Sequence, residues 1–484
     1  MAVQSAGLKR GTLGLTSIVY QGITHIAPAA NVLFSWTFIA SFAGAAMPLS
    51  LALSVVVCFF IANPVAQFSR YIPSAGGYYT FASQGLGPRF GFITTWAYLF
   101  YDWIGPAGAI GYFGVLSETF IKSNSGVDIP WWLYALAAFV VVWILTYIGV
   151  SISSRAAAIL GTLELLVMTA LGVSFLLHPA HGSSFAAPLD PRSSPTGLQG
   201  ILLGMVFSIL ALSGFEAAAP LAEEAQKPTE SICKAIMWSL LAVGAFYIFS
   251  TYSTAIGFGT SQAQMKVFGS ASDSVGAFST AARTLWGGFW VLIYFAVLNS
   301  ILGVGISCTN AATRVMYTMG RVGTLPPIFA TIHPRFRTPT VAIHVQQIVG
   351  MIAVVAVAII LGASQIFGFL GTAVTVSLIV MYGLANIALY VYVRREHPAE
   401  FNLWQHLIFP AAGTIMLAIV LYETITSNQA YPLNWAPWVI VVWLAIGAAV
   451  MLWVQARRPG ALEKGSTELA LVAEEEPAVG MQSI

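Results

Sequence analysis

Charged residues are scarce in this sequence. Only 8% of its 484 residues are Asp, Glu, Lys or Arg, whereas an ordinary soluble domain carries about 25%. So few charges cannot cover a water-facing surface, which excludes a soluble globular protein. The 20 basic residues nearly balance the 18 acidic ones, and no long basic run is present. Nucleic acid is therefore not an expected partner.

Cysteines and enzyme motifs are equally sparse. The three cysteines, Cys58, Cys233 and Cys308, lie far apart in the sequence and show neither a disulfide framework nor metal-ligand spacing. We expect them to be small buried apolar residues, and we predict no metal site and no bound cofactor. The sequence has no H-E-x-x-H, no nucleophile elbow and no phosphate loop, so an enzyme is not expected. A membrane-embedded enzyme or sensor stays a remote alternative.

Long hydrophobic runs are what the chain has in abundance, since 58% of its residues are hydrophobic. A helix needs about 20 apolar residues to cross a bilayer, and lipid forces the backbone to satisfy its own hydrogen bonds. The sequence therefore predicts an all-α polytopic membrane protein with twelve transmembrane helices. They are expected at Thr16–Phe42, Leu49–Gln67, Gly91–Leu116, Trp131–Val150, Ala156–Leu177, Leu198–Leu221, Ala235–Ile256, Trp286–Met319, Val341–Leu361, Ile366–Val393, Leu407–Ile425 and Trp435–Val454.

The loops between these runs predict the orientation. With the N-terminus in the cytoplasm, sixteen basic residues face the cytoplasm and only four face outward, namely Lys122, Arg192, Lys266 and Arg283. This asymmetry predicts a multi-pass protein of the cell (inner) membrane with both termini cytoplasmic. We expect a cytoplasmic segment at 1–15, a core at 16–393, two further helices within 407–454, and a disordered acidic tail at 457–484.

Two of the expected spans contain helix-breaking residues. Gly22 and Pro28 interrupt the first span, and Ser213 and Gly214 interrupt the sixth. Interrupted helices at matching places of two five-helix halves, here about 16–177 and 198–393, indicate an inverted-repeat transporter with a site near the membrane midplane. The alternative is a proline kink and a glycine packing contact, both common in membrane helices.

Three carboxylates fall deep within the spans: Asp102, Glu164 and Glu216. Each costs about 2.5–3.5 kcal/mol on the insertion scale, so each needs a partner. No Lys or Arg is expected at the same depth, and His25 is the one other deep ionisable residue. The counter-charge is therefore expected to be a proton, a metal ion or a cationic substrate. Alternatively, the acids are neutral or bonded to local groups, and Glu216 beside the break could accept freed backbone N–H groups as a cap does.

Asp102 gives the sharpest of these predictions. It lies about 16 Å into its span, close to the midplane. Tyr98, Tyr101 and Trp103 are its neighbours in sequence, and aromatic faces combined with a carboxylate suit an ammonium group. The alternative is an aromatic packing face that contains a hydrogen-bonded aspartate.

Three stretches of the chain resemble signatures of the amino acid–polyamine–organocation (APC) permeases. They are Tyr71–Tyr79 with Leu86–Gly91, then Ser213–Glu216 with Glu223, Glu224 and Lys227–Ser231, then Asn299–Arg314 with Gly320–Pro326 and His333–Pro339. The resemblance implies a five-plus-five inverted repeat of the leucine-transporter type with two extra C-terminal helices. It also implies alternating access around a site between helices one, three, six, eight and ten.

The first break departs from the pattern of amino acid importers, which usually carry glycines there to hold the substrate carboxylate. Here the segment contains Ile26, Ala27 and Pro28, and a proline has no N–H to offer. A proline at this place resembles the polyamine-importing branch. That branch also has an Asp followed by a proline in helix three, similar to Asp102 and Pro106, although the spacing differs by one residue.

The resemblance and the residues together predict a secondary transporter that imports an amino acid or small organic amine with protons. A substrate exchanger on the same fold is the alternative. The predicted substrate-binding residues are Ile26, Ala27, Pro28, Tyr98, Asp102, Ser213, Gly214, Phe215 and Glu216. Glu164, where some proton-coupled relatives carry lysine, is expected to couple transport to a proton. Ser307 and Thr309 could instead ligate Na+.

Overall fold

The structure is a computed structural model that describes residues 11–270, 274–426, 431–458 and 460–464. The described chain is helical, with two isolated β-bridges, Leu13 with Ala225 and Ile332 with Pro339. The first ten residues and most of the tail predicted at 457–484 lie outside the described residues.

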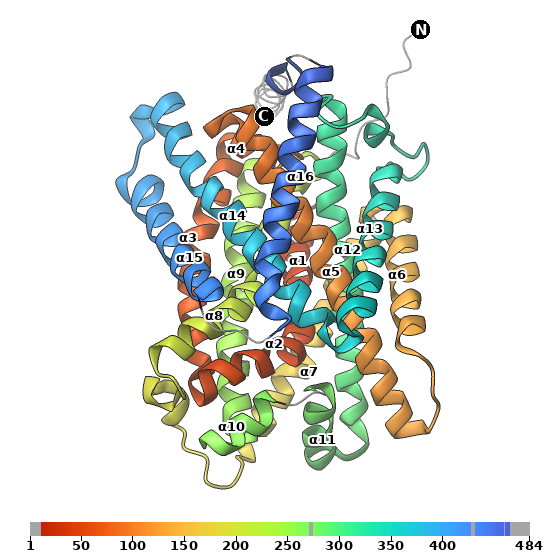
Figure 1. Cartoon of the computed structure of the whole chain (residues 1–484), viewed down its shortest axis with the longest axis vertical. Helices are drawn as coiled ribbons and strands as arrows, with labels where there is room; N and C mark the ends of the chain where they lie inside the picture. The colour runs from red at the N-terminus through yellow and green to blue at the C-terminus, as the bar shows by residue number, and fades with distance from the viewer. Residues whose placement is uncertain (1–10, 271–273, 427–430, 459, 465–484) are drawn as a thin grey trace.

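Sixteen α-helices are present in the described residues, and several pack lengthwise along one axis (Figure 1). They are α1 (Leu15–Ile26), α2 (Pro28–Ala43), α3 (Met47–Tyr71), α4 (Tyr78–Leu86), α5 (Pro88–Ser125), α6 (Trp131–Ile148), α7 (Val150–Leu177), α8 (Leu198–Leu212), α9 (Pro228–Phe258), α10 (Gln262–Gly269), α11 (Ser274–Trp286), α12 (Val291–Arg321), α13 (Thr340–Leu361), α14 (Ile366–Glu396), α15 (Phe409–Thr426) and α16 (Ala436–Arg457). A 3-10 segment, η4 (Phe215–Glu224), follows α8.

Nine helical stretches of the described chain are long and apolar enough to cross a membrane. This confirms a multi-pass α-helical membrane protein. The count differs from twelve for identifiable reasons: Leu15–Tyr71 forms one stretch that contains the first two expected spans. In addition, α5 is not among the nine stretches, and the apolar stretch described in α7, Gly161–Leu177, is shorter than a span.

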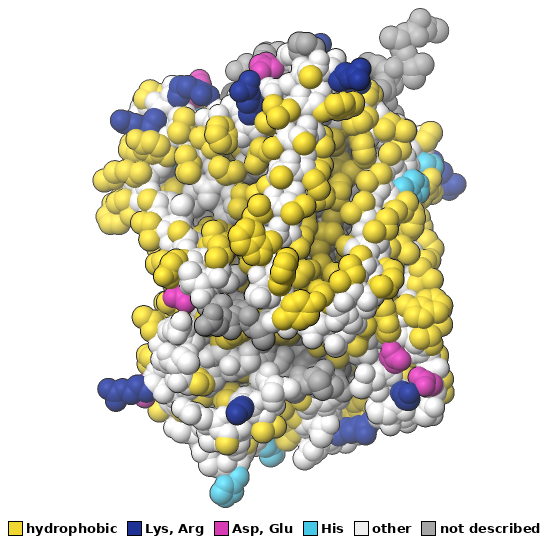
Figure 2. All heavy atoms as spheres, viewed as in Figure 1, with side chains coloured by type: hydrophobic (Ala, Val, Ile, Leu, Met, Phe, Trp, Pro, Cys, Tyr) yellow, Lys and Arg dark blue, Asp and Glu magenta, His cyan; other side chains and the backbone are white. Residues whose placement is uncertain are grey.

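The surface has the polarity of a protein embedded in lipid. A broad band of hydrophobic side chains separates two ends at which most charged side chains gather (Figure 2). Large apolar side chains in this chain are well exposed, for example Ile359 at 79% and Trp438 at 60%. We call the end that carries α4 the α4 end and the end that carries α10 and α11 the α10 end (Figure 1).

Several helices extend beyond the expected spans. The third span, expected to end at Leu116, continues in α5 to Ser125. The eighth, expected from Trp286, lies within the apolar helical stretch Gly276–Arg321, in which a 3-10 turn separates α11 from α12. Apolar character marks where lipid requires a helix, and it does not mark where the helix stops in water.

Both predicted helix breaks are present. Between α1 and α2 the chain turns at Ala27, which adopts a left-handed conformation with φ of 55°. Between α8 and η4 it turns at Ser213 and Gly214, where Gly214 has φ of 126°. Gly22 does not interrupt the first span as predicted, because it lies inside α1. A Cβ at Gly22 would come within 2.7 Å of Ser239 Oγ, so this glycine serves close helix packing.

The packing of the bundle brings both breaks to its centre. Helix α1 packs against α7, α9, α12 and η4, and α5 packs against α12, α13 and α14. The ends of α1 and α8 are therefore surrounded by α5, α12 and α14, and the candidate site lies among them.

Candidate functional site

A small cavity of about 60 Å³ lies where the two breaks meet. Its lining comes from α1, α2, α5, α8, α12 and α14, which correspond to the expected spans one, three, six, eight and ten. Ligand pockets for drug-sized molecules usually measure about 300–1,000 Å³. The cavity in this conformation therefore has room only for a small ligand or a few water molecules.

Three of the predicted substrate-binding residues line this cavity: Ile26, Ala27 and Ser213. The others lie around it without being part of its lining. These are Pro28, Tyr98, Asp102, Gly214, Phe215 and Glu216. Lining residues that the sequence did not single out include Asn31, Phe34, Leu210, Val304 and Phe367.

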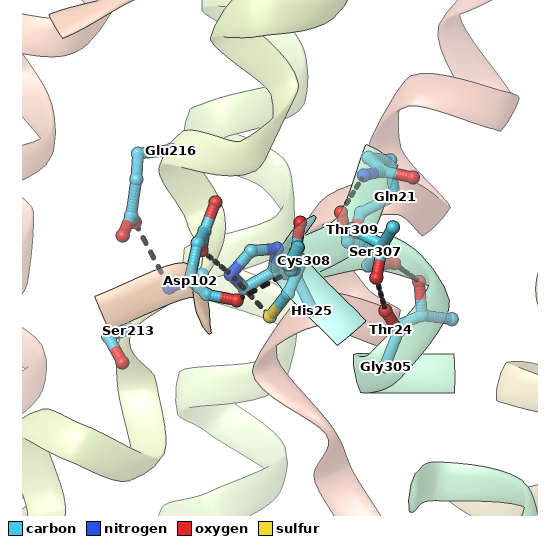
Figure 3. A network of polar contacts seen from close by, with 12 residues as sticks. Gln21, Thr24, His25, Asp102, Ser213, Glu216, Gly305, Ser307, Cys308 and Thr309 are labelled. Atoms are coloured by element: carbon cyan, nitrogen blue, oxygen red, sulfur yellow. Dashed lines mark hydrogen bonds and ion pairs between the residues drawn. The ribbon is translucent and has the colours of Figure 1, made fainter. Parts of the chain in front are cut away.

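Asp102 is paired with His25. The distance from His25 Nε2 to Asp102 Oδ1 is 3.2 Å, and both side chains are buried (Figure 3). Cys308 Sγ lies 3.3 Å from the same His25 nitrogen. The expectation that the deep acids have no base beside them is therefore wrong for Asp102. Sequence spacing could not show this group, because its members come from α1, α5 and α12.

The surroundings of Asp102 are aromatic, as expected, but the rings serve different neighbours. Tyr101 packs its ring against His25, with 5.6 Å between the centroids. The Tyr98 ring packs against Tyr78 at 5.6 Å. The backbone carbonyl of Asp102 accepts a hydrogen bond from Gln346 Nε2 at 3.0 Å, which attaches this turn of α5 to α13.

Glu216 has partners on both carboxylate oxygens. Oε2 accepts the Gly214 backbone N–H at 3.0 Å, and Oε1 accepts the Tyr382 hydroxyl at 2.8 Å. The first of these contacts is visible in Figure 3. Glu216 thus satisfies a backbone donor freed by the break, which is the structural role that the sequence offered as an alternative.

Aromatic side chains border the site at both ends. On the α4 side the rings of Phe215 and Tyr382 stack at 5.9 Å. Toward the α10 end Phe34, Tyr112 and Phe367 contact one another with centroids 5.0–5.5 Å apart. The predicted cover, Phe215, is fully buried against α14 in this conformation.

The three predicted coupling residues lie in three separate places. Glu164 is buried in α7 and accepts a hydrogen bond from Asn299 Nδ2 at 3.3 Å. Ser307 Oγ lies 2.7 Å from Thr24 Oγ1, on the side of α12 that faces α1. Thr309 Oγ1 accepts from Gln347 Nε2 at 2.9 Å, on the side that faces α13. Asn299 and Ser307 are about 12 Å apart along α12, so Glu164 and the Ser307 hydroxyl contact this helix at different levels.

The backbone carbonyl and the side chain of Ser307 both already have hydrogen-bond partners in the protein. Gln21 Nε2 donates to the Ser307 backbone carbonyl at 3.0 Å, and the Thr24 hydroxyl contacts the Ser307 side chain (Figure 3). A neutral amide therefore occupies one of the two acceptor positions of this carbonyl oxygen.

Two ion pairs, one buried and one partly exposed, hold the α4 end together, and sequence reasoning missed both. Arg314 Nε lies 3.0 Å from Glu224 Oε2, with both side chains buried. Arg321 binds Glu223 with two nitrogens, at 3.0 and 3.3 Å. The Glu224 carbonyl also accepts the Leu13 N–H at 3.0 Å. The end of η4 is thereby attached to α12 and to the segment before α1. The sequence signal for these ion pairs was the pair of adjacent acids Glu223 and Glu224, which the sequence analysis interpreted only as part of a family motif.

Taken together, a helical membrane bundle with two discontinuous helices around a small buried cavity defines a membrane transporter. The comparisons with known proteins agree. The model of the amino acid permease family matches residues 18–458, so this chain belongs to the amino acid permease family of the APC superfamily.

The relatives of this chain have varied substrates. The low-affinity putrescine importer PlaP of Escherichia coli strain K12 is 24% identical over 446 residues, covering 88% of this chain and 91% of PlaP. The branched-chain amino acid permease BcaP of Bacillus subtilis is 27% identical over 321 residues, or 62% of this chain and 65% of BcaP. The methylthioribose transporter of Bacillus subtilis is 24% identical over 463 residues, or 91% and 92%.

Proposed function

We propose that this protein is a secondary active transporter that imports a small organic amine or an amino acid across the cell membrane by alternating access, coupled to protons. Two broken helices that meet at a buried cavity carry this proposal, since such breaks expose polar backbone at the midplane of inverted-repeat transporters. The proposal includes twelve spans, an inverted repeat of five plus five helices, and both termini in the cytoplasm.

The conformation is consistent with alternating access. The ion pairs Arg314–Glu224 and Arg321–Glu223 hold the α4 end closed, and inward opening has to break or move them. Because the arginines lie in α12 and the glutamates at the end of η4, a rearrangement of the second broken helix would separate the pairs. A buried charge left without its partner costs about 3–5 kcal/mol, so opening needs a compensating change elsewhere.

We assign the ammonium group of the substrate to Asp102. This carboxylate is fully buried one turn from the cavity-lining Gly105 and Pro106, and a cation attracts it more strongly than a neutral group does. His25 Nε2 lies 3.2 Å from Asp102 Oδ1. The ammonium group therefore has to share this carboxylate with the imidazole or displace the imidazole from it. The putrescine importer among the relatives supports an amine, and the branched-chain amino acid permease supports a zwitterion as the second candidate.

The test is binding and uptake by the purified chain in liposomes. We expect a primary amine or diamine to bind at least as well as the amino acid of matching side chain. Asp102→Asn should weaken the amine by about 1.5–3 kcal/mol, the range of a hydrogen bond to a charged group, and a neutral analogue much less. If a zwitterion displaces every amine at one tenth of its concentration, and Asp102→Asn changes neither affinity, the amine assignment is wrong.

Glu164 is our candidate for the transported proton. It is buried in α7, and its hydrogen bond comes from the neutral Asn299 amide. Glu164→Gln preserves the shape and removes the titratable group, so accumulation driven by a pH gradient should be lost while substrate still binds. Wild-type accumulation by this variant would exclude Glu164 from coupling.

Two further measurements separate the alternatives. An exchanger moves substrate only when substrate is also present on the other side of the membrane, whereas a symporter accumulates it in empty liposomes. Replacing Na+ by K+ at constant pH should leave uptake unchanged, since the Ser307 and Thr309 hydroxyls point to different helices.

A further inference from the structure

His25, Asp102 and Cys308 bring three metal-binding atoms to one point. The three come from α1, α5 and α12, and their ligand atoms all lie within 4.8 Å of one another. His25 Nε2 is 3.2 Å from Asp102 Oδ1 and 3.3 Å from Cys308 Sγ. Figure 3 shows the three side chains pointing toward one another between the helices.

These separations fit a tetrahedral ion. Zinc binds imidazole nitrogen and carboxylate oxygen at about 2.0–2.1 Å and thiolate sulfur at about 2.3 Å. Tetrahedral angles then place nitrogen and oxygen about 3.3 Å apart, and nitrogen and sulfur about 3.5 Å apart. The distances from His25 Nε2 to Asp102 Oδ1 and to Cys308 Sγ are therefore within about 0.2 Å of those values.

Hydrogen bonding inside the protein accounts for only part of the group. Asp102 is approached by His25 Nε2 at 3.2 Å and has Tyr98 and Cys308 as further side-chain neighbours, whereas His25 Nδ1 has no hydrogen-bond partner within the described residues. Asp102 is 0% exposed and His25 is 3% exposed. The single Nε2–H of His25 also cannot donate a well-aligned hydrogen bond to both Asp102 and Cys308.

The geometry points to a binding site for a soft divalent transition-metal ion such as Zn²⁺ at His25, Asp102 and Cys308. Histidine nitrogen, cysteine sulfur and carboxylate oxygen are each zinc ligands, and catalytic zinc sites have three protein ligands and a fourth position open to water. His25 and Cys308 also line the cavity, which provides the space for that fourth ligand and a path for the ion.

The ion would act as an inhibitor of transport. It joins α1, α5 and α12, which line the cavity together, and it occupies the carboxylate that we assign to the ammonium. This competition rests on the proposed function, whereas metal binding itself does not. Metal and amine should therefore exclude one another if both assignments hold.

Cobalt substitution of the purified full-length protein in detergent tests the site directly. After treatment with a chelator and a thiol reductant, Co²⁺ should bind once per chain and produce the near-ultraviolet charge-transfer band of a cobalt–thiolate bond. Cys308→Ser should abolish the band. Cys58→Ser and Cys233→Ser are matched controls that should keep it, since Cys58 is buried in α3 and Cys233 is half-buried in α9.

The other two ligands give a graded result. Asp102→Asn and His25→Gln should keep the thiol but weaken Co²⁺ binding about tenfold or more. Because a variant could fail to fold, X-ray absorption of the zinc-loaded wild-type protein gives an independent measurement. It should show one sulfur at about 2.3 Å and nitrogen or oxygen ligands at about 2.0 Å. A wild-type protein without the thiolate band, or a band that survives Cys308→Ser, overturns the proposal.

Discussion

The two helix breaks that meet at the cavity differ in the backbone conformation that interrupts the helix. At the first, Ala27 carries a side chain in a left-handed conformation with φ of 55° and ψ of 66°. At the second, Gly214 has φ of 126° and ψ of −16°, a region that L-residues rarely adopt. A Cβ at Gly214 would also lie 2.8 Å from the Ile26 backbone nitrogen. The second break thus needs its glycine partly because the first break is packed directly against it.

The breaks also differ in how their freed backbone groups are satisfied. The Ile26 carbonyl at the first break accepts from the Asn31 amide and from the Tyr247 hydroxyl, both neutral donors. The Gly214 N–H at the second donates to the Glu216 carboxylate. Asn31 also donates to the Ala211 carbonyl at 3.2 Å and so links the two breaks. Both carboxylate oxygens of Glu216 are therefore engaged by the protein at the second break.

Replacing Gly214 should have the largest effect on this arrangement. Gly214→Val adds a β-branched side chain where φ is 126° and where His25 and Ile26 backbone atoms lie within 3 Å. Overpacking and backbone strain each cost about 1–3 kcal/mol, so we expect loss of substrate binding with membrane insertion preserved. Thermal unfolding and ligand binding in detergent measure both effects.

Gly383→Val is the matched control for that experiment. Gly383 lies inside α14, and a Cβ there meets no atom within 4 Å. This variant should bind substrate as the wild type does. If Gly214→Val also binds normally, the close approach of the two breaks is not needed for the site.

Much of the fold could be predicted from the sequence because lipid leaves few choices. The apolar runs located the long helices, and Pro28 and Gly214 marked the two breaks, since the first lacks an N–H and the second tolerates positive φ. The short helices α4, α10 and α11 were missed. Helices α4 and α10 lie outside the apolar runs, where no lipid constraint applies, and α11 lies in the first part of the apolar stretch Gly276–Arg321.

The site was predicted less well, for a geometric reason. Its polar groups come from helices far apart in the sequence, and nothing in a single chain's pattern brings His25 to Asp102 and Cys308. Ser307 and Thr309 supply oxygens that suit Na+, and this stays a prediction. Residues two apart on a helix face different directions, and these hydroxyls contact α1 and α13 respectively.

The link from Glu216 to α14 should give an intermediate effect. Tyr382→Phe removes the hydroxyl that donates to Glu216 Oε1 at 2.8 Å and leaves the stacked ring in place. A hydrogen bond to a charged group contributes about 1.5–3 kcal/mol, and the apparent unfolding temperature should fall accordingly.

Tyr78→Phe provides the comparison, because Tyr78 is equally buried and its ring lies 6.3 Å from Tyr382. Its hydroxyl has no hydrogen-bond partner among the described residues, so removing it should cost little. Equal losses in the two variants would mean that the Glu216 contact does not stabilise the second break.

The smallest effect is expected at the first break. Ala27→Gly relieves a left-handed conformation that costs an L-residue about 1–2 kcal/mol, while the added glycine costs about 0.5–1 kcal/mol in entropy. Ala311→Gly is the control: Ala311 is buried within α12, where glycine only loses stability. Unfolding measured side by side should show Ala27→Gly to be less damaging than Ala311→Gly by about 1 kcal/mol or more. Ile26, the neighbour of Ala27, packs directly against Gly214 of the second break. A larger loss of stability in Ala27→Gly than in Ala311→Gly would therefore show that the Ala27 methyl group, and not the backbone turn, holds the first break in position.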